Sequence, residues 1–224
     1  MKQRQRHHTG PYDPQTITRA VTHIRLEAAN AGKLTALDDL AQVYLALCQQ
    51  YVTLFCTQER PNKLRAPLFT TPLSERWHRV AIQQAAGIAR SWRTNRAQAY
   101  QDYADDLLDY QEQETEGTLD AGVQEPAWKE WNVPTLRQTC IQANANVVVL
   151  EPSQDSTFDY WFTISTLAFR KQLLVPIKLA DYHREALKGK TINSSVTLNK
   201  RGDGWWLTLS YDKAVPVHTA PSAR

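Results

Sequence analysis

The first part of the chain repeats hydrophobic residues at helical spacing. Asp13-Pro14 supplies a capping side chain followed by a proline at the first helical position, and Gly32 is a plausible stop. The apolar positions between them are Ile17, Val21, Ile24 and Ala28. Because these positions are three or four residues apart, the basic N-terminal segment 1–33 is predicted to be helical.

Two longer patterns of the same period predict a helical lobe over residues 34–116. The first begins with a capping box at Thr35-Ala-Leu-Asp38. Its apolar stripe is Leu37, Leu40, Tyr44, Leu47, Tyr51 and Leu54. The second helix runs from Ser74 to Arg96 and continues to Glu116. Its apolar quadrant holds Trp77, Ala81, Ala85, Ile88 and Trp92.

From residue 146 the period changes to that of strands. The expected strands are Val147–Leu150, Phe158–Leu167, Leu173–Leu179, Ile192–Leu198 and Trp205–Tyr211, with a short helix at Asp181–Lys188. Pro176 favours an edge strand, and Asn-Lys-Arg-Gly-Asp-Gly is typical of a hairpin loop. The sequence therefore predicts an α+β protein, in which a helical lobe precedes a small antiparallel β-barrel or curled sheet over 146–213. An acidic linker with tryptophans, 117–145, joins them, and 214–224 is expected to be a frayed tail.

Composition and charge narrow the functional classes. The 224 residues are 42% hydrophobic and suffice for one large or two small domains, and no apolar run reaches the roughly 20 residues of a membrane span. Residues 59–96 carry eight basic and two acidic groups, whereas 100–130 carry ten acidic groups and one lysine. This asymmetry is typical of a polyanion-binding surface beside an acidic segment. The acidic segment is either solvated or covers the basic surface.

An arginine stripe lies opposite the apolar quadrant of the Ser74–Arg96 helix. It contains Arg76, Arg79, Arg90 and Arg93, with Arg96 following. The stripe carries no acidic partner at i+4 that would make it a salt-bridge ladder, and guanidinium groups suit bidentate phosphate contact, so these five residues are candidate nucleic-acid ligands. A solvated charged face is the alternative. A second candidate set is Lys178, Lys190, Lys200 and Arg201, at strand ends and loops.

No catalytic constellation is evident. The sequence lacks phosphate-cradling and nucleophile-elbow motifs, and no cofactor or metal site is predicted. The widely spaced Cys48, Cys56 and Cys140 are expected to be reduced thiols. The helix-face carboxylates Asp102, Asp105, Asp106 and Asp109 could hold Mg²⁺ but are more typical of a solvated face. Trp128 and Trp131 are expected to be packing anchors rather than a stacking platform.

Five short segments carry a family resemblance through their order and spacing. They are Ala85-Ala-Gly-Ile-Ala-Arg-Ser-Trp92, Trp131-Asn-Val-Pro-Thr135, Phe158-Asp-Tyr-Trp-Phe-Thr-Ile-Ser-Thr-Leu167, Leu174-Val-Pro-Ile-Lys-Leu179 and Trp205-Trp-Leu-Thr-Leu-Ser-Tyr211. Together they resemble the N-terminal half of the TnpB/OrfB transposon-encoded proteins and their type V CRISPR effector relatives, over about residues 37–213. That family opens with a β-strand, where this sequence predicts a helix.

The resemblance implies a recognition lobe and a wedge β-barrel that grip a guide RNA and its heteroduplex with DNA. The family's RuvC-like nuclease uses an Asp, Glu, Asp metal triad, and its G-[IV]-D-x-G-like strand and the C-x-x-C pairs of the family's zinc ribbon are absent here. The expectation is therefore a non-catalytic RNA- and DNA-binding half, cytoplasmic and nucleoid-associated, without membrane contact, to which a separate nuclease subunit could be supplied in trans.

Three alternatives stay open. The chain could be an interaction subunit that docks a basic partner through the acidic helix. It could be an enzyme whose site includes Asp155 and Asp159. It could also be the product of a truncated, non-functional transposase gene.

Overall fold

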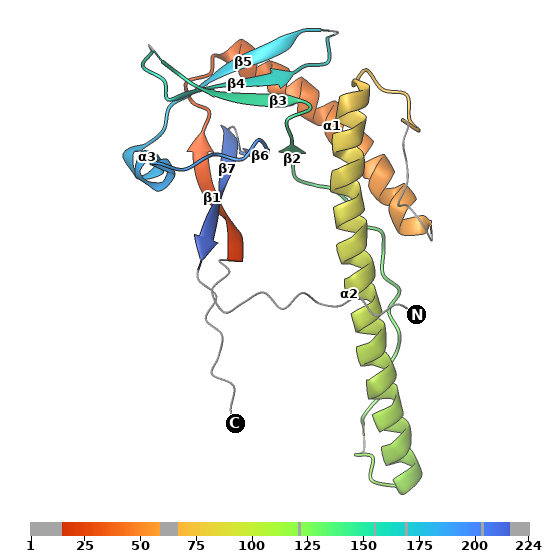
Figure 1. The fold of residues 1–224 in the computed structure, drawn as a ribbon. Coiled ribbons are helices and arrows are strands. Elements are labelled where there is room, and N and C mark those ends of the chain that lie inside the picture. The colour runs from red at the N-terminus through yellow and green to blue at the C-terminus, as the bar shows by residue number, and fades with distance from the viewer. Residues whose placement is uncertain are drawn as a thin grey trace, which may run out of the picture. The chain divides into compact units, whose positions relative to one another are not determined.

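The computed structural model describes residues 15–58, 67–120, 122–154, 156–168, 170–202 and 204–215 (Figure 1). The predicted helix start at Asp13, Asp155 and most of the predicted tail lie outside these ranges. The helices are α1 (Ala31–Thr57), α2 (Glu75–Glu116) and α3 (Asp181–Leu187). The strands are β1 (Gln15–Arg25), β2 (Cys140–Ala143), β3 (Val148–Pro152), β4 (Tyr160–Ser165), β5 (Gln172–Ile177), β6 (Val196–Arg201) and β7 (Gly204–Val215). The predicted α+β class is confirmed. None of the described helices is both long and apolar enough to cross a bilayer.

The chain divides into two compact units. The β unit contains the described residues of 1–37, 140–166 and 170–224, and the helical unit those of 38–139 with 167–168. In the β unit the strands form two antiparallel sheets, ordered β1-β7-β6-β2 and β3-β4-β5. The described strands do not close into a barrel. Pro176 lies on β5, an edge strand as predicted, and the β6–β7 hairpin turns at Gly202, whose φ is 57°.

The prediction of a helix over 1–33 is wrong for the described part, because residues 15–25 form β1. The strand pairs with β7 along its length, and its register shifts between Val21 and Ile24. His23 has a φ of 64° at this bulge. The extra residue lets Val21 and Ile24 both face the core, where they are 7% and 0% exposed. A β-bulge therefore reproduced the three-residue spacing of a helix.

The helical unit is built on the contact between α1 and α2. The predicted stripe of α1 is buried from Leu40 to Tyr51, and α2 buries Trp77, Ala81 and Ala85. Tyr44 packs edge-on against Trp77, with ring centroids 5.4 Å apart, and its hydroxyl donates to Gln84 Oε1 at 2.8 Å. Large rings and small alanines at helical spacing let the two helices approach closely.

The start of α1 differs from the predicted capping box. The helix begins at Ala31, and Asn30 Oδ1 accepts a hydrogen bond from the Lys33 N–H at 3.0 Å, which is the geometry of an N-cap. Thr35 is one turn inside, where its hydroxyl donates to the Ala31 carbonyl. Gly32, the predicted stop of the first helix, lies in the first turn of α1.

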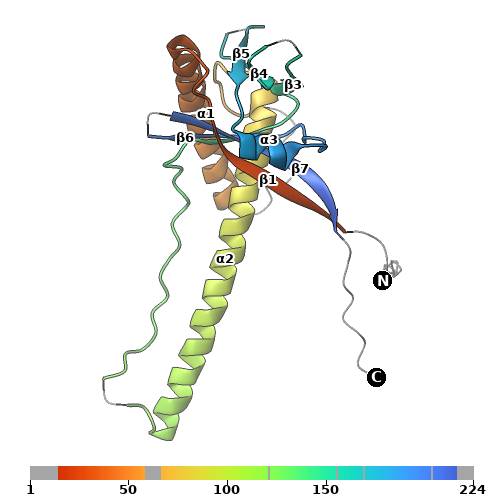
Figure 2. The same ribbon diagram turned by 90° about the vertical axis from the view of Figure 1, so that its left-hand side faces the viewer.

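Helix α2 is followed by a return segment, residues 117–139, which runs back along it (Figure 2). Gly117 ends the helix in the left-handed conformation, with φ 69°, and its N–H reaches the Glu114 carbonyl. The described residues of the return segment contain no helix or strand. The predicted linker 117–145 therefore ends in a strand, β2, which pairs with β6.

Candidate nucleic-acid interface

Three of the five predicted arginines form an exposed face on the first half of α2. Arg76, Arg79 and Arg90 are exposed, on the side of the helix opposite Trp77 and Ala85. Arg76 and Arg90 make no ion pair with any described residue. At 1.5 Å rise per residue the face is about 21 Å long, which matches a run of several phosphates. We call these three residues the arginine face.

Arg79 has an acidic neighbour that the sequence analysis missed. Its Nη2 lies 2.5 Å from Glu75 Oε1, at i and i+4 on the helix, and both side chains are more than half exposed. Exposed pairs of this kind contribute about 0–1 kcal/mol, so a phosphate can replace the carboxylate at small cost. Arg79 remains a candidate ligand, with one competing anion in its own structure.

Arg93 forms hydrogen bonds at the end of α1 and is not part of the arginine face. Its Nη2 donates to the carbonyl oxygens of Phe55 and Gln58, the second at 2.7 Å. These carbonyls lie in and just after the last turn of α1, where the helix leaves acceptors without partners and carries partial negative charge. The position of Arg93 is therefore explained by packing between the two helices.

Arg96 holds the return segment against α2. It pairs with Glu130 at 2.8 Å, and its guanidinium carbon lies 6.0 Å and 5.9 Å from the ring centroids of Trp92 and Trp128. The hydrogen bonds from Arg96 and then Trp128 hold the pKa of Glu130 below its usual value. Arg96 lies on the apolar side of α2, so it is not part of the arginine face.

The tryptophans beside Arg96 act as packing anchors, as expected for Trp128. Its ring centroid is 5.2 Å from that of Tyr100 and 5.7 Å from that of Tyr103, on the second half of α2. Trp92 donates from Nε1 to the Asn132 carbonyl at 2.9 Å. Together these contacts fix residues 128–132 along the helix.

The second predicted set does not form one patch. Lys200 and Arg201 lie at the β6–β7 hairpin, where Lys200 Nζ is 5.7 Å from the Trp205 ring centroid. Lys190 Nζ is 5.9 Å from the ring centroid of Tyr211, six residues further along β7, a span of about 20 Å in a strand. Lys178 is exposed after the end of β5.

Two basic residues outside the predicted set join Lys190 around Tyr211. Arg19 on β1 is the cross-strand partner of Tyr211, so both side chains point to the same face of the sheet. Lys213, two residues further along β7, lies on that face too and is exposed. We call Arg19, Lys190, Tyr211 and Lys213 the Tyr211 cluster. Only the strand pairing could have found it, because its residues lie far apart in the sequence.

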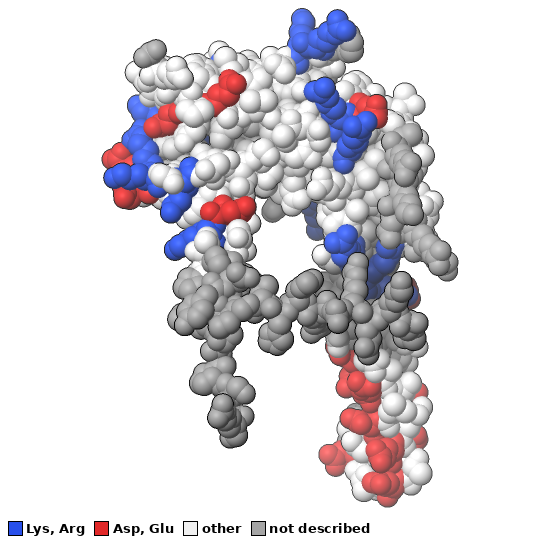
Figure 3. Space-filling model, in the orientation of Figure 1, with Lys and Arg blue, Asp and Glu red and all other residues white. Residues whose placement is uncertain are grey.

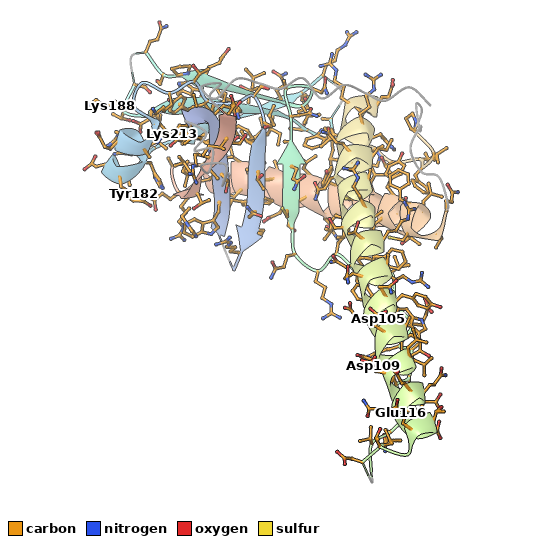
Figure 4. All side chains as sticks on the ribbon, turned by 60° about the horizontal axis from the view of Figure 1, so that its bottom comes forward. Asp105, Asp109, Glu116, Tyr182, Lys188 and Lys213 are labelled. Atoms are coloured by element: carbon orange, nitrogen blue, oxygen red, sulfur yellow. The ribbon has the colours of Figure 1, made fainter. Side chains whose placement is uncertain are left out.

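The second half of α2 is acidic and exposed. Figure 3 shows Asp and Glu side chains over the far end of the helix, and Figure 4 shows Asp105, Asp109 and Glu116 along it. The described residues contain no group of three or more His, Cys, Asp or Glu side chains that could hold a metal ion. The Mg²⁺ alternative therefore gains no support from the geometry.

Asp159, a candidate catalytic residue under the enzyme alternative, forms hydrogen bonds with other parts of the β unit. Its carboxylate accepts hydrogen bonds from Arg184 Nε at 2.7 Å and from the Leu179 N–H at 2.7 Å. The pKa of Asp159 is lowered, and the hydrogen bonds from Arg184 are the largest cause. This arrangement ties β4 to α3. Its predicted companion, Asp155, lies outside the described residues.

The cysteines are free thiols, as expected from their spacing. Cys48 is buried, and burial raises the pKa of the Cys140 thiol.

Comparison with known proteins adds no family: no protein-family model matches the chain, and no curated protein matches it.

Proposed function

We propose that this protein binds a structured or guide RNA, and DNA through an RNA heteroduplex, as the recognition and wedge part of a TnpB-like RNA-guided protein. The observation that carries the proposal is the arginine face, with Arg76 and Arg90 exposed and without an ion-pair partner among the described residues. In this proposal the chain is non-catalytic, acts beside the nucleoid, and receives any nuclease activity in trans.

The chemistry of the arginine face fits backbone recognition. A guanidinium group presents a planar fork of donors that matches phosphate oxygens. Contacts to phosphates position a nucleic acid without reading its sequence, and in guided systems base pairing does the reading. The lack of a base-reading motif is therefore consistent with this function.

The Tyr211 cluster adds a different kind of contact. Tyr211 is partly exposed and surrounded by Arg19, Lys190 and Lys213. An aromatic ring among cations can stack an unpaired base while the cations bind its phosphates. This cluster suits a single-stranded part of the RNA, whereas the arginine face suits a helical part.

The resemblance gives further support in one place where the sequence prediction failed. The family opens with a β-strand, and β1 occupies that place in this chain. We propose that the β1-β7-β6-β2 sheet is the curled, wedge-like element, in the role that a barrel fills in the family.

A second candidate function rests on the acidic half of α2. Asp105, Asp109 and Glu116 are exposed and project from one helix, as a surface for a basic protein partner would. Under this alternative the arginine face is only a solvated surface, and RNA does not bind.

The first experiment is purification at low salt, with an RNase-treated control and sequencing of any RNA that co-purifies. We expect a discrete RNA whose binding weakens steeply with salt, because phosphate contacts release counterions. Protein that folds but retains no RNA, and has no salt-dependent affinity for any, would contradict the proposal. A basic partner lost on neutralising Asp105 and Asp109 would then favour the second function.

A further inference from the structure

A groove of about 370 Å³ lies in the β unit between β3 and the segment 190–194. It is lined mainly by apolar side chains. They include Val148, Val149, Leu150, Pro152, Tyr160 and Ile192. Three consecutive residues of β3 line it, although neighbouring side chains of a strand point to opposite faces. The groove therefore follows the edge of the strand rather than one face of the sheet.

The backbone of β3 has hydrogen-bonding groups on the groove side. β3 is an edge strand and pairs only with β4 in the described sheet. Ser165 N–H donates to the Val147 carbonyl and Ser153 N–H to the Asp159 carbonyl. By alternation, Val149 and Glu151 bond to β4, while the N–H and C=O of Leu150 point to the open edge.

The opposite wall is also an extended backbone. Asn193 N–H donates to the Ser210 carbonyl on β7 at 2.7 Å, and Ile192 is the bridge partner of Tyr211. The same alternation turns the N–H and C=O of Ile192 away from β7, and Ile192 and Ser194 both line the groove. Backbone segments with outward-facing amide groups thus line both sides of the groove.

The charge of the groove is one-sided. Lys190 is the one charged residue among those that line it, and its side chain is exposed. Val149 on the opposite wall is 47% exposed, so the groove has an accessible apolar side chain opposite Lys190. An apolar segment with a carboxylate side chain would complement both features.

We propose that this groove is a docking site for an extended peptide segment of a partner protein, which adds to the edge of β3 as a further strand. The peptide pairs with the N–H and C=O of Leu150, places apolar side chains against Val149 and Ile192, and sets an acidic side chain against Lys190. Strand addition of this kind takes affinity from main-chain bonds and specificity from alternate side chains. The site is separate from the arginine face and shares Lys190 with the Tyr211 cluster.

The test is selection from a display library of random heptapeptides on the RNase-treated full chain, followed by fluorescence polarisation of the most enriched peptide. We expect enriched peptides with alternating apolar residues and an Asp or Glu. Leu150→Pro removes the outward N–H and should weaken binding about tenfold, as expected for one hydrogen bond, whereas Leu150→Val should bind nearly as the parent does. Lys190→Glu should reverse the charge preference, with Lys190→Gln as its control.

N-methylation of the peptide gives a test that does not depend on a folded variant. A peptide that adds as a strand loses affinity on N-methylation at alternate positions only. No enriched peptide, equal binding to Leu150→Pro and Leu150→Val, or affinity loss that ignores the alternation would each overturn the proposal. RNA retention of the Leu150 variants is measured in parallel, and because Leu150 belongs to neither the arginine face nor the Tyr211 cluster, failure of this site is distinguishable from failure of the RNA-binding function.

Discussion

The five candidate arginines of α2 fall into two groups with different partners. Arg76, Arg79 and Arg90 project from α2, whereas Arg93 donates to carbonyls at the end of α1 and Arg96 joins Glu130 between two tryptophans. Residue type does not separate the two groups, and helical spacing sets apart only Arg96, which lies on the apolar side of α2. The partners that separate them come from α1 and from the return segment.

This difference shows where charge is available for a ligand. The Nη2 group of Arg93 donates to two carbonyl oxygens, and turning the whole planar fork toward a phosphate would leave those acceptors unpaired, which costs about 1–3 kcal/mol each when they are buried. An exposed guanidinium group gives up only bound water or a weak surface ion pair when it binds a phosphate. The two groups should therefore fail in different assays when each is mutated.

The largest expected effect is on RNA affinity. Replacing Arg76, Arg79 and Arg90 together with Gln should lower affinity by about 10²-fold at 0.1 M salt, because three counterion-releasing contacts are lost. The slope of log affinity against log salt should become shallower by about two to three. Electrophoretic titration across salt concentrations measures both.

The matched control is Arg93→Gln with Arg96→Gln, which removes two charges from the same helix outside the arginine face. If that pair lowers the salt slope as much per charge as the triple variant does, the distinction between the two groups is wrong. Circular dichroism of each variant separates lost binding from lost folding.

The next effect is on stability. Arg93→Ala leaves the Phe55 and Gln58 carbonyls without their donor and should lower the free energy of unfolding by about 2 kcal/mol, measured by urea denaturation. Arg93→Lys keeps the charge but not the planar fork, so we expect an intermediate loss. An unchanged urea midpoint for Arg93→Ala would show that this contact is not part of the folded core.

The helices and most strands follow from local patterns, and the exceptions have specific physical causes. The stripe from Leu40 to Tyr51 needed only helical periodicity, and the β6–β7 hairpin only its glycine-rich turn. β1 was missed because a bulge at His23 imitates a three-residue period and because its partner residues on β7 are 181 to 200 positions away in the sequence. β2, with four residues, is too short to show a period.

The candidate site was predictable only to the level of residue type. The sequence identified five candidate arginines without separating them. It could not show that Phe55 lies beside Arg93 or Glu130 beside Arg96, because these partners are distant in the chain. The Tyr211 cluster needed the register of β1 on β7. A local sequence pattern therefore only predicts which charged side chains are exposed. Tertiary contacts determine whether they are.

Lowering the pH should reduce the stability of the fold without changing the RNA affinity of the folded protein. Tyr51 and Thr71 side chains bond to the two ring nitrogens of the buried His78, and desolvation lowers the pKa of this histidine despite Glu75 nearby. The unfolded chain then binds a proton first, at about pH 6.5, so stability is complete above that pH and falls as pH drops through the lower folded pKa. One histidine can contribute at most about 1.4 kcal/mol per pH unit.

Urea midpoints between pH 7.5 and 5 measure this dependence. His78→Gln should flatten the curve, while the arginines, charged throughout, keep the RNA affinity of the folded protein constant at fixed ionic strength. A wild-type midpoint that does not change over this range would show that His78 is not held neutral by the fold.

The smallest effect tests the one internal competitor of the arginine face. Glu75→Gln removes the carboxylate that lies 2.5 Å from Arg79, so a phosphate no longer displaces an ion pair. An exposed i,i+4 pair contributes about 0.3–0.5 kcal/mol, so RNA affinity should rise about twofold. The rise should vanish in an Arg79→Gln background, because the competing pair is then already absent. A double-mutant cycle measured by RNA titration gives this coupling directly, and equal effects of Glu75→Gln with and without Arg79 would mean that Arg79 makes no contact with the RNA.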